Sequence, residues 1–173
     1  MYFMRHGQSE FNLGINRTGR DPNTPDAILT DEGQRQAMQT ATKLKGKNIT
    51  QLCCSPYRRA IQTAEIVGSV LGLTPVIEPL ASEMKAYSCD IGSPVSVLRE
   101  AWPHLDFSPV PDGEWWLPFP EPHTHLMQRV RAFFEKWRFE EAVDTTLVVS
   151  HYYFINAVTG SAPVNAEVVE HPF

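Results

Sequence analysis

The sequence predicts a three-layer α/β/α fold, with a mostly parallel central sheet and helices on both of its faces. Short apolar runs alternate with segments of helical spacing, which is the pattern of parallel strands joined by crossover helices. The run at 146–149 is β-branched and apolar on both sides, as expected for a central parallel strand. The length of 173 residues is typical of one domain, so we expect a single domain over residues 1–173.

The strands are expected where apolar runs end at polar clusters. Residues 2–4 predict a first buried strand, and the apolar run at 49–54 predicts a second. We expect a short third strand at 76–77, the central strand at 146–149 and a last edge strand at 168–169.

Helix start and stop signals place the helices between these strands. Thr30 is a suitable N-cap for a helix that continues to about residue 44. Ser55-Pro56 predicts a second helix with proline in its first turn, and Gly72 stands where that helix should end. Apolar residues at helical spacing predict a helix over 123–137. Shorter helices are expected at 93–102 and 154–159.

Two stretches are expected to lack regular structure. The polar stretch that contains Gly14, Gly19, Pro22 and Pro25 predicts a loop. Residues 84–125 are rich in proline and show no clean period over most of their length, so we expect an irregular segment that covers the substrate.

Composition excludes several classes of partner. The net charge is −5 and the pI is about 5.6, which argues against nucleic acid, because phosphate backbones are bound by basic surfaces. No apolar run has the length of a membrane span, and no signal peptide is visible. The three cysteines show no framework spacing and are expected to be reduced and packed. A cytoplasmic location is therefore expected.

Polar clusters follow three of the expected strands: Arg5-His6, residues 55–59 and Ser150-His151. Ligands of such sheets bind beyond the carboxyl ends of the strands, so these clusters should meet. A neutral imidazole can attack phosphorus, and a protonated one can donate to a phosphate oxygen. A single histidine would be interpreted as a packing residue, but two at parallel strand ends favour a functional site.

Arginines beside these histidines indicate an anionic ligand. Arg5 precedes His6, and Arg58 and Arg59 stand in the first turn of an expected helix, where anions are favoured. A guanidinium group matches two phosphate oxygens, so a small phosphorylated substrate is expected. Neighbours on a helix point about 100° apart, so only one of Arg58 and Arg59 should face the site.

Phosphoryl transfer also needs a proton for the leaving oxygen, which a carboxylic acid can supply. Glu83 is the candidate, as the first carboxylate after the third strand that does not adjoin Pro79, with Glu78, Asp90 and Asp112 as competitors. No complete set of metal ligands accompanies His123 and His125, so no metal is expected.

Four segments then resemble landmarks of the histidine phosphatase superfamily, also called the phosphoglycerate mutase-like family. In order they are RHGQSEFN at 5–12, LTDEG at 29–33, CSPYRRAIQTA at 54–64 and VVSH at 148–151. The resemblance implies the three-layer fold and a phosphohistidine intermediate, with no metal or other cofactor. It implies that His6 is the nucleophile, that Arg5, Asn12, Arg59 and His151 bind the phosphate, and that Glu83 is the proton donor.

Departures from the family pattern favour a short member of phosphatase type. Tyr152-Tyr153 stand where many members have glycines, and the loop at 19–21 lacks the tryptophan of true mutases. The longer insertions and C-terminal tail of mutases are also missing. We therefore expect a phosphomonoester hydrolase, with a phosphoglycerate mutase and a non-catalytic phosphate-binding module as alternatives. The sequence leaves the substrate's identity and the oligomeric state open.

Overall fold

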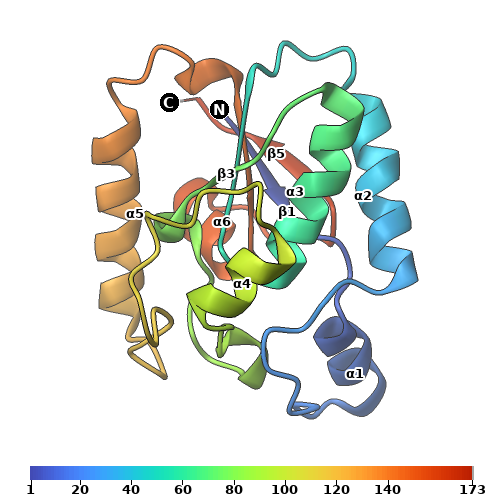
Figure 1. The fold of residues 1–173 in the computed structure, drawn as a ribbon, viewed down its shortest axis with the longest axis vertical. Coiled ribbons are helices and arrows are strands. Elements are labelled where there is room, and N and C mark those ends of the chain that lie inside the picture. The colour runs from blue at the N-terminus through green and yellow to red at the C-terminus, as the bar shows by residue number, and fades with distance from the viewer. Residues whose placement is uncertain (173) are drawn as a thin grey trace.

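A mixed five-stranded sheet forms the centre of the computed structural model, which describes residues 1–172 (Figure 1). The strand order is β3-β2-β4-β1-β5. All neighbouring strands are parallel except β5, which pairs antiparallel with β1. The strands are β1 Tyr2–Arg5, β2 Gln51–Cys54, β3 Val76–Ile77, β4 Thr146–Ser150 and β5 Val168–Glu170. The predicted parallel sheet and its fully buried central strand β4 are confirmed.

Helices cover both faces of the sheet, as predicted for three layers (Figure 1). Leu147 and Val149 pack in one apolar cluster with α2, α3 and α4, whereas Val148 packs in a second cluster with α5 and α6. This alternation follows from the two-residue period of a strand, which sends successive side chains to opposite faces. The helices are α1 Glu10–Thr18, α2 Asp31–Leu44, α3 Arg58–Leu71, α4 Val95–Ala101, α5 His123–Trp137 and α6 Tyr152–Thr159, with short 3₁₀ turns at Pro79–Ala81, Ser88–Asp90 and Val143–Thr145.

Most predicted helix ends agree with the structure. The Thr30 hydroxyl accepts a hydrogen bond from the Gly33 amide and caps α2, and Gly72 ends α3 with φ of 72°. Helix α3 begins later than predicted, with Tyr57 as its N-cap, so Pro56 lies before the helix. The reason is tertiary, because the Asp26 carboxylate accepts from the Arg58 amide at 3.0 Å and satisfies the helix start there.

The predicted loop after the first strand is wrong for its first part, since Glu10–Thr18 forms helix α1, whereas the part that contains Gly19, Pro22 and Pro25 is a loop as expected. Ser9 and Asn12 form a capping box at its start, and Phe11 is buried. Gly14 is tolerated inside the helix because Pro22 packs against it, and a Cβ there would lie 2.8 Å from the Pro22 Cβ. Gly19 then ends the helix in the left-handed conformation.

Residues 84–125 are irregular apart from a 3₁₀ turn and helices α4 and the first turns of α5. Val95, Leu98 and Phe107 belong to the core cluster that also contains α3, so this part of the segment packs on the sheet layer. Only residues in its first part line the pocket described below. None of the helices within residues 1–172 combines the length and apolar character needed to cross a membrane.

Candidate active site

The carboxyl ends of β1, β2 and β4 meet at one edge of the sheet, as the polar clusters predicted. A pocket with a cavity volume of about 210 Å³ opens there. It brings together five of the six predicted site residues, and the sixth, His151, has its ring centroid 5.1 Å from that of His6. The pocket is lined by Arg5, His6, Ser9, Phe11, Asn12, Ile15, Asn16, Arg59, Glu83, Tyr87, Cys89, Asp90, Tyr152 and Tyr153.

His6 is held in one tautomer and kept neutral. Its Nδ1 lies 2.7 Å from the Gly7 carbonyl oxygen, and because a carbonyl only accepts, Nδ1 carries the proton. Nε2 is therefore left with its lone pair. Burial, followed by the charges of Arg59 and Arg5, holds the pKa of His6 well below its usual value. This is the form of imidazole that can attack an electrophile.

Two glycines allow the His6 loop to lie directly against the start of α2. A Cβ on Gly7 would lie 2.3 Å from the Gly33 carbonyl oxygen, and a Cβ on Gly33 would lie 2.0 Å from the backbone carbonyl oxygen of Gln8. Both distances are far below contact range, so only glycine fits at either position. The Gly7 amide donates to Thr63 Oγ1 at 3.1 Å, which also ties the loop to α3.

His151 is fully buried and is oriented by Ser55. Its Nε2 lies 2.8 Å from Ser55 Oγ, which also accepts from the Tyr57 amide at 3.4 Å. A hydroxyl can accept from an amide and donate at the same time, so the Ser55 hydroxyl can donate to Nε2, and in that tautomer Nδ1 of His151 carries the proton. Burial and the neighbouring Arg59 hold the pKa of His151 well below its usual value.

The two arginines of the pocket differ in their hydrogen-bond partners. Arg5 donates from Nη1 to the Pro163 carbonyl at 2.9 Å. Arg59 is buried, donating from Nη2 to Asp90 at 2.9 Å and from Nη1 to the Cys89 carbonyl at 2.6 Å. Arg58 is not among the lining residues, so Arg59 is the neighbour that faces the pocket.

Two buried side-chain nitrogens in residues 1–172 have no hydrogen-bond partner, and both belong to this site. They are Arg5 Nε and His151 Nδ1. An unpaired buried donor costs about 1–3 kcal/mol, so such groups are rare unless a ligand satisfies them. Their position beside His6 indicates a place for an anion.

Asn12 presents its amide nitrogen to the same space. Its Oδ1 accepts at 3.1 Å from the Ser9 amide, the Ser9 hydroxyl and Asn165 Nδ2, which fixes the orientation of the side-chain amide. Nδ2 of Asn12 is left without a protein partner in the described part of the chain. It adds a third donor to those of Arg5 and His151.

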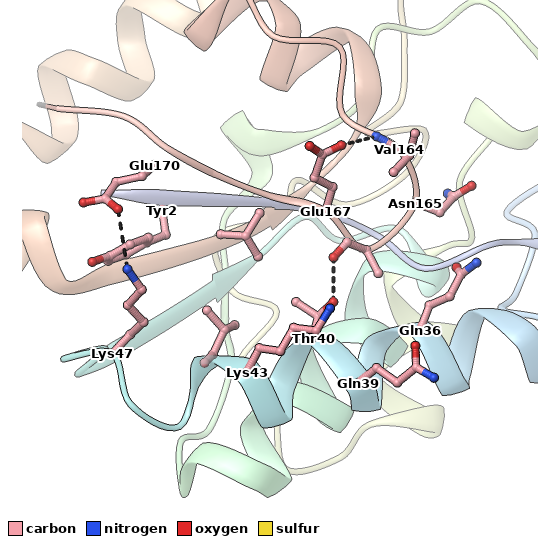
Figure 2. A pocket seen from close by; sticks show the side chains of 13 residues that line it. Tyr2, Gln36, Gln39, Thr40, Lys43, Lys47, Val164, Asn165, Glu167 and Glu170 are labelled. Atoms are coloured by element: carbon pink, nitrogen blue, oxygen red, sulfur yellow. Dashed lines mark hydrogen bonds and ion pairs between the residues drawn. The ribbon is translucent and has the colours of Figure 1, made fainter.

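Asn165 also belongs to a larger groove between α2 and β5, with a cavity volume of about 520 Å³ (Figure 2). Its Nδ2 donates to the His6 carbonyl at 3.1 Å, so this residue connects the groove wall to the site. The groove is lined by polar side chains that already have partners in the chain, such as Lys47 with Glu170 (Figure 2) and Gln36 with the Gln8 amide. It contains none of the residues predicted for chemistry.

Glu83 lies in the pocket and caps the start of α6. Its Oε1 accepts from the backbone amides of Met84 at 2.9 Å, Tyr153 at 3.0 Å and Phe154 at 3.3 Å. Burial, followed by the charge of Asp90, raises the pKa of Glu83 to about 7. A carboxyl group with this pKa can both donate and accept a proton near neutral pH.

The competing carboxylates are placed differently. Glu78 binds Lys136 and the Trp137 indole on the α5 side of the sheet, and Asp112 is exposed. Asp90 does line the pocket, but one of its oxygens is paired with Arg59 and the other accepts from two backbone amides. Glu83 is the carboxyl group in the pocket that has no cationic partner.

Arg129 of α5 holds the backbone that carries Glu83. Nη1 donates to the carbonyls of Leu80 at 2.8 Å and Ser82 at 2.9 Å, and Nη2 donates to the Glu83 carbonyl at 3.1 Å. Nε and Nη2 also donate to both oxygens of Glu121, at 2.9 Å each. All five guanidinium N–H groups are thus used. They join α5 to the backbone at 80–83 and to Glu121, which lies near the end of the covering segment, residues 84–125.

Replacing Arg129 with methionine is expected to destabilise the fold by about 3–5 kcal/mol, because the buried Glu121 carboxylate would lose its bidentate partner. Burial raises the pKa of Glu121, but the hydrogen bonds and charge of Arg129 and the charge of Lys85 bring it down to about 2. Urea denaturation at pH 7 measures the change, with the exposed neighbour Arg131→Met as the matched control. Equal stability of the two variants would contradict the role of Arg129.

Several residues of the site carry no signal that sequence reasoning could use. Arg129 and Asn165 act through contacts between segments far apart in the chain. Ser55 belongs to the predicted polar cluster at 55–59, but its contact with His151 was not predicted. The three cysteines are free and buried, and burial raises the pKa of Cys53 to about 12, in line with a packing role.

Fold and site together define an α/β protein that gathers anion-binding donors around a neutral histidine at the carboxyl edge of a parallel sheet. The chain belongs to the histidine phosphatase superfamily (branch 1), because the sequence model of that family matches residues 1–167. Membership supports enzymatic phosphoryl transfer.

Similar curated proteins are named as probable phosphoglycerate mutases. The Photorhabdus laumondii protein named "Probable phosphoglycerate mutase GpmB" is 29% identical over 172 residues, covering 96% of this chain and 77% of the relative. A protein of the same name from Escherichia coli O1:K1 is 29% identical over 153 residues, covering 87% and 68%.

Solved structures with similar folds include a phosphatase and a mutase by name. The mycobacterial glucosyl-3-phosphoglycerate phosphatase complexed with VO3 has a TM-score of 0.67 at 20% identity, over 97% of this chain and 88% of that one. Phosphoglycerate mutase from Bacillus anthracis has a TM-score of 0.63 at 21% identity, over 96% and 84%. At these identities the likeness establishes the phosphoglycerate mutase-like fold alone.

Proposed function

We propose that the chain is a metal-independent phosphomonoester hydrolase that works through a phosphohistidine at His6. The observation that carries the proposal is the pair of unpartnered buried donors, Arg5 Nε and His151 Nδ1, beside a neutral His6. A dianionic phosphoryl group would satisfy both donors. Among residues 1–172 no group of three or more His, Cys, Asp or Glu side chains is placed to bind a metal ion.

In the first step Nε2 of His6 attacks phosphorus as the bond from phosphorus to the ester oxygen breaks. Arg5, Asn12 and His151 donate to the phosphoryl oxygens, and Arg59 adds its charge from the pocket wall. Donors fixed before the reaction stabilise the charge that builds up in the transition state, and each is worth about 3 kcal/mol of barrier in comparable sites. Protonated Glu83 gives its proton to the leaving oxygen.

In the second step water attacks the phosphohistidine. Glu83, now a carboxylate, accepts a proton from that water, the bond between Nε2 and phosphorus breaks, and inorganic phosphate leaves. The same carboxyl group therefore acts first as acid and then as base, which a pKa of about 7 allows.

Phosphoglycerate mutase activity is the second candidate, favoured by the names of the curated relatives. A mutase returns the phosphoryl group from histidine to another hydroxyl instead of to water. It would isomerise phosphoglycerate without net release of phosphate, so the two activities are separated by assaying both products in one incubation.

Phosphate release from para-nitrophenyl phosphate in the presence of EDTA tests the proposal. Turnover by the wild type is expected, because none of the proposed steps uses a metal ion. Absence of turnover, combined with a thermal shift on adding inorganic phosphate, would contradict the hydrolase and leave a mutase or a phosphate-binding module, which the isomerisation assay separates. Loss of activity on chelation would contradict metal independence.

A further inference from the structure

Aromatic side chains from three separate parts of the chain form one wall of the pocket. The rings of Phe11 from α1 and Tyr87 from the covering segment lie 5.5 Å apart. Tyr153 of α6 lines the same pocket as Tyr87, and its ring lies 5.2 Å from that of Tyr152. We call Phe11, Tyr87, Tyr152 and Tyr153 the aromatic wall.

The aromatic wall extends from the phosphate site to solvent. At its inner end the Arg5 guanidinium lies 5.3 Å from the centroid of the Tyr152 ring. At its outer end Tyr87 is 38% exposed, although its ring contacts that of Phe11. A leaving group attached to a phosphate at His6 must pass along these rings, where an apolar or aromatic group gains contact area.

Both cationic side chains that line the pocket belong to the proposed phosphate site. They are Arg5 and Arg59, the cations among its described lining residues. Arg59 is also paired with Asp90, and Glu83 is a further acidic group. A second anionic group on the substrate would face these acids and the aromatic wall with no cation to pair with, which is costly in a partly desolvated site.

From this arrangement we propose that the pocket selects phosphomonoesters of uncharged alcohols with an aromatic or bulky apolar group, and rejects substrates with a second anionic group. The proposal rests on the proposed hydrolase function and gives its substrate class. It also disfavours phosphoglycerate, whose carboxylate would be the unpaired anion.

Two matched substrate pairs test the preference for an aromatic group and the rejection of a second anionic group separately. Phenethyl phosphate and ethyl phosphate both release primary alcohols and differ by the ring, and we expect kcat/KM to favour the first by about 10–200-fold. Glycerol 3-phosphate and 3-phosphoglycerate differ at the carboxylate, and we expect the second to be disfavoured by at least about 100-fold, because its charge would be left unpaired.

Variants of Tyr87 test whether the wall is responsible. Tyr87→Ala should lower the phenethyl to ethyl ratio about 10-fold, whereas Tyr87→Phe keeps the ring and should keep the ratio. Tyr87→Arg adds a cation at the mouth and should raise the activity on 3-phosphoglycerate relative to glycerol 3-phosphate. Val97→Arg, on the exposed face of α4, adds the same charge away from the pocket and should leave both ratios unchanged.

The outcomes distinguish failure of the substrate class from failure of the function. No hydrolysis of any of the four esters would overturn the proposed function itself. Hydrolysis of all four with 3-phosphoglycerate equal to or better than glycerol 3-phosphate would leave the hydrolase intact and overturn the substrate class. Equal ratios in Tyr87→Ala and the wild type would remove the aromatic wall as its cause.

Discussion

Replacing His6 with alanine is expected to lower kcat for para-nitrophenyl phosphate by at least about 10⁴-fold, as removal of a nucleophile does in comparable enzymes. The loss follows because His6 supplies the attacking lone pair on Nε2, its proton being on Nδ1, which lies 2.7 Å from the Gly7 carbonyl oxygen. Arg5, Asn12 and His151 stay in place, so the variant should still bind inorganic phosphate. A drop in kcat with phosphate binding retained separates loss of chemistry from loss of the site.

Trapping the intermediate makes this prediction specific to one residue. Wild-type protein quenched at alkaline pH during turnover of ³²P-labelled ester should carry acid-labile label that maps to residue 6. His104→Ala, which changes an exposed histidine paired with Glu65, is the matched control and should retain both label and turnover. Label on another residue, or turnover by His6→Ala within 10-fold of the wild type, would contradict the assignment.

The parts of the fold that local physics controls could be predicted from the sequence. The N-cap at Thr30, the glycine at 72 and the β-branched run that became β4 depend on neighbouring residues only, and the structure has each where expected. Helix α1 could not be predicted, because a glycine in its middle lowers helix propensity. It is stabilised instead by the contact of Gly14 with Pro22 and by burial of Phe11, which belong to the tertiary structure.

The same division applies to the site. Strand ends predicted that the segments carrying His6, Arg59 and His151 would meet, because parallel strands carry their carboxyl ends to one edge. Glu83 was the predicted proton donor, preferred over three other carboxylates by its place in the chain and by the family resemblance, and in the structure it is distinguished by burial and the cap it makes on α6. The pairing of Arg59 with Asp90 could not be predicted, since no periodic pattern links positions 31 residues apart.

Glu83→Gln is expected to lower turnover by about 10²–10⁴-fold for esters of poor leaving groups, because general acid catalysis contributes an effect of this size. Glutamine retains an oxygen that can accept from the α6 amides but has no proton to give. Esters of para-nitrophenol, which leave readily as anions, should lose less in the phosphorylation step. A loss of the same size for phenethyl phosphate and para-nitrophenyl phosphate in single-turnover reactions would contradict the role as proton donor.

The pH dependence of kcat/KM and of the free energy of unfolding, each compared between the wild type and Glu83→Gln, also tests the role of Glu83. With a pKa of about 7, Glu83 is protonated below neutral pH and loses its acid function above it, so wild-type kcat/KM relative to the variant should fall as pH rises through about 7. His6 should add no step near pH 6–7, since its pKa is held well below that range.

Because the pKa of Glu83 is raised on folding, the unfolded chain releases this proton first. The carboxyl group therefore destabilises the fold as pH rises from about 4.5 to 7, by about 3 kcal/mol when complete. Urea denaturation at pH 5 and pH 8 should show the stability of the variant relative to the wild type to be higher at pH 8 than at pH 5. A variant that loses activity while gaining stability in this way would show that Glu83 is needed for catalysis although its buried carboxylate lowers the stability of the folded state. Equal stability differences at both pH values would mean that the carboxyl group is not held in an unfavourable buried state.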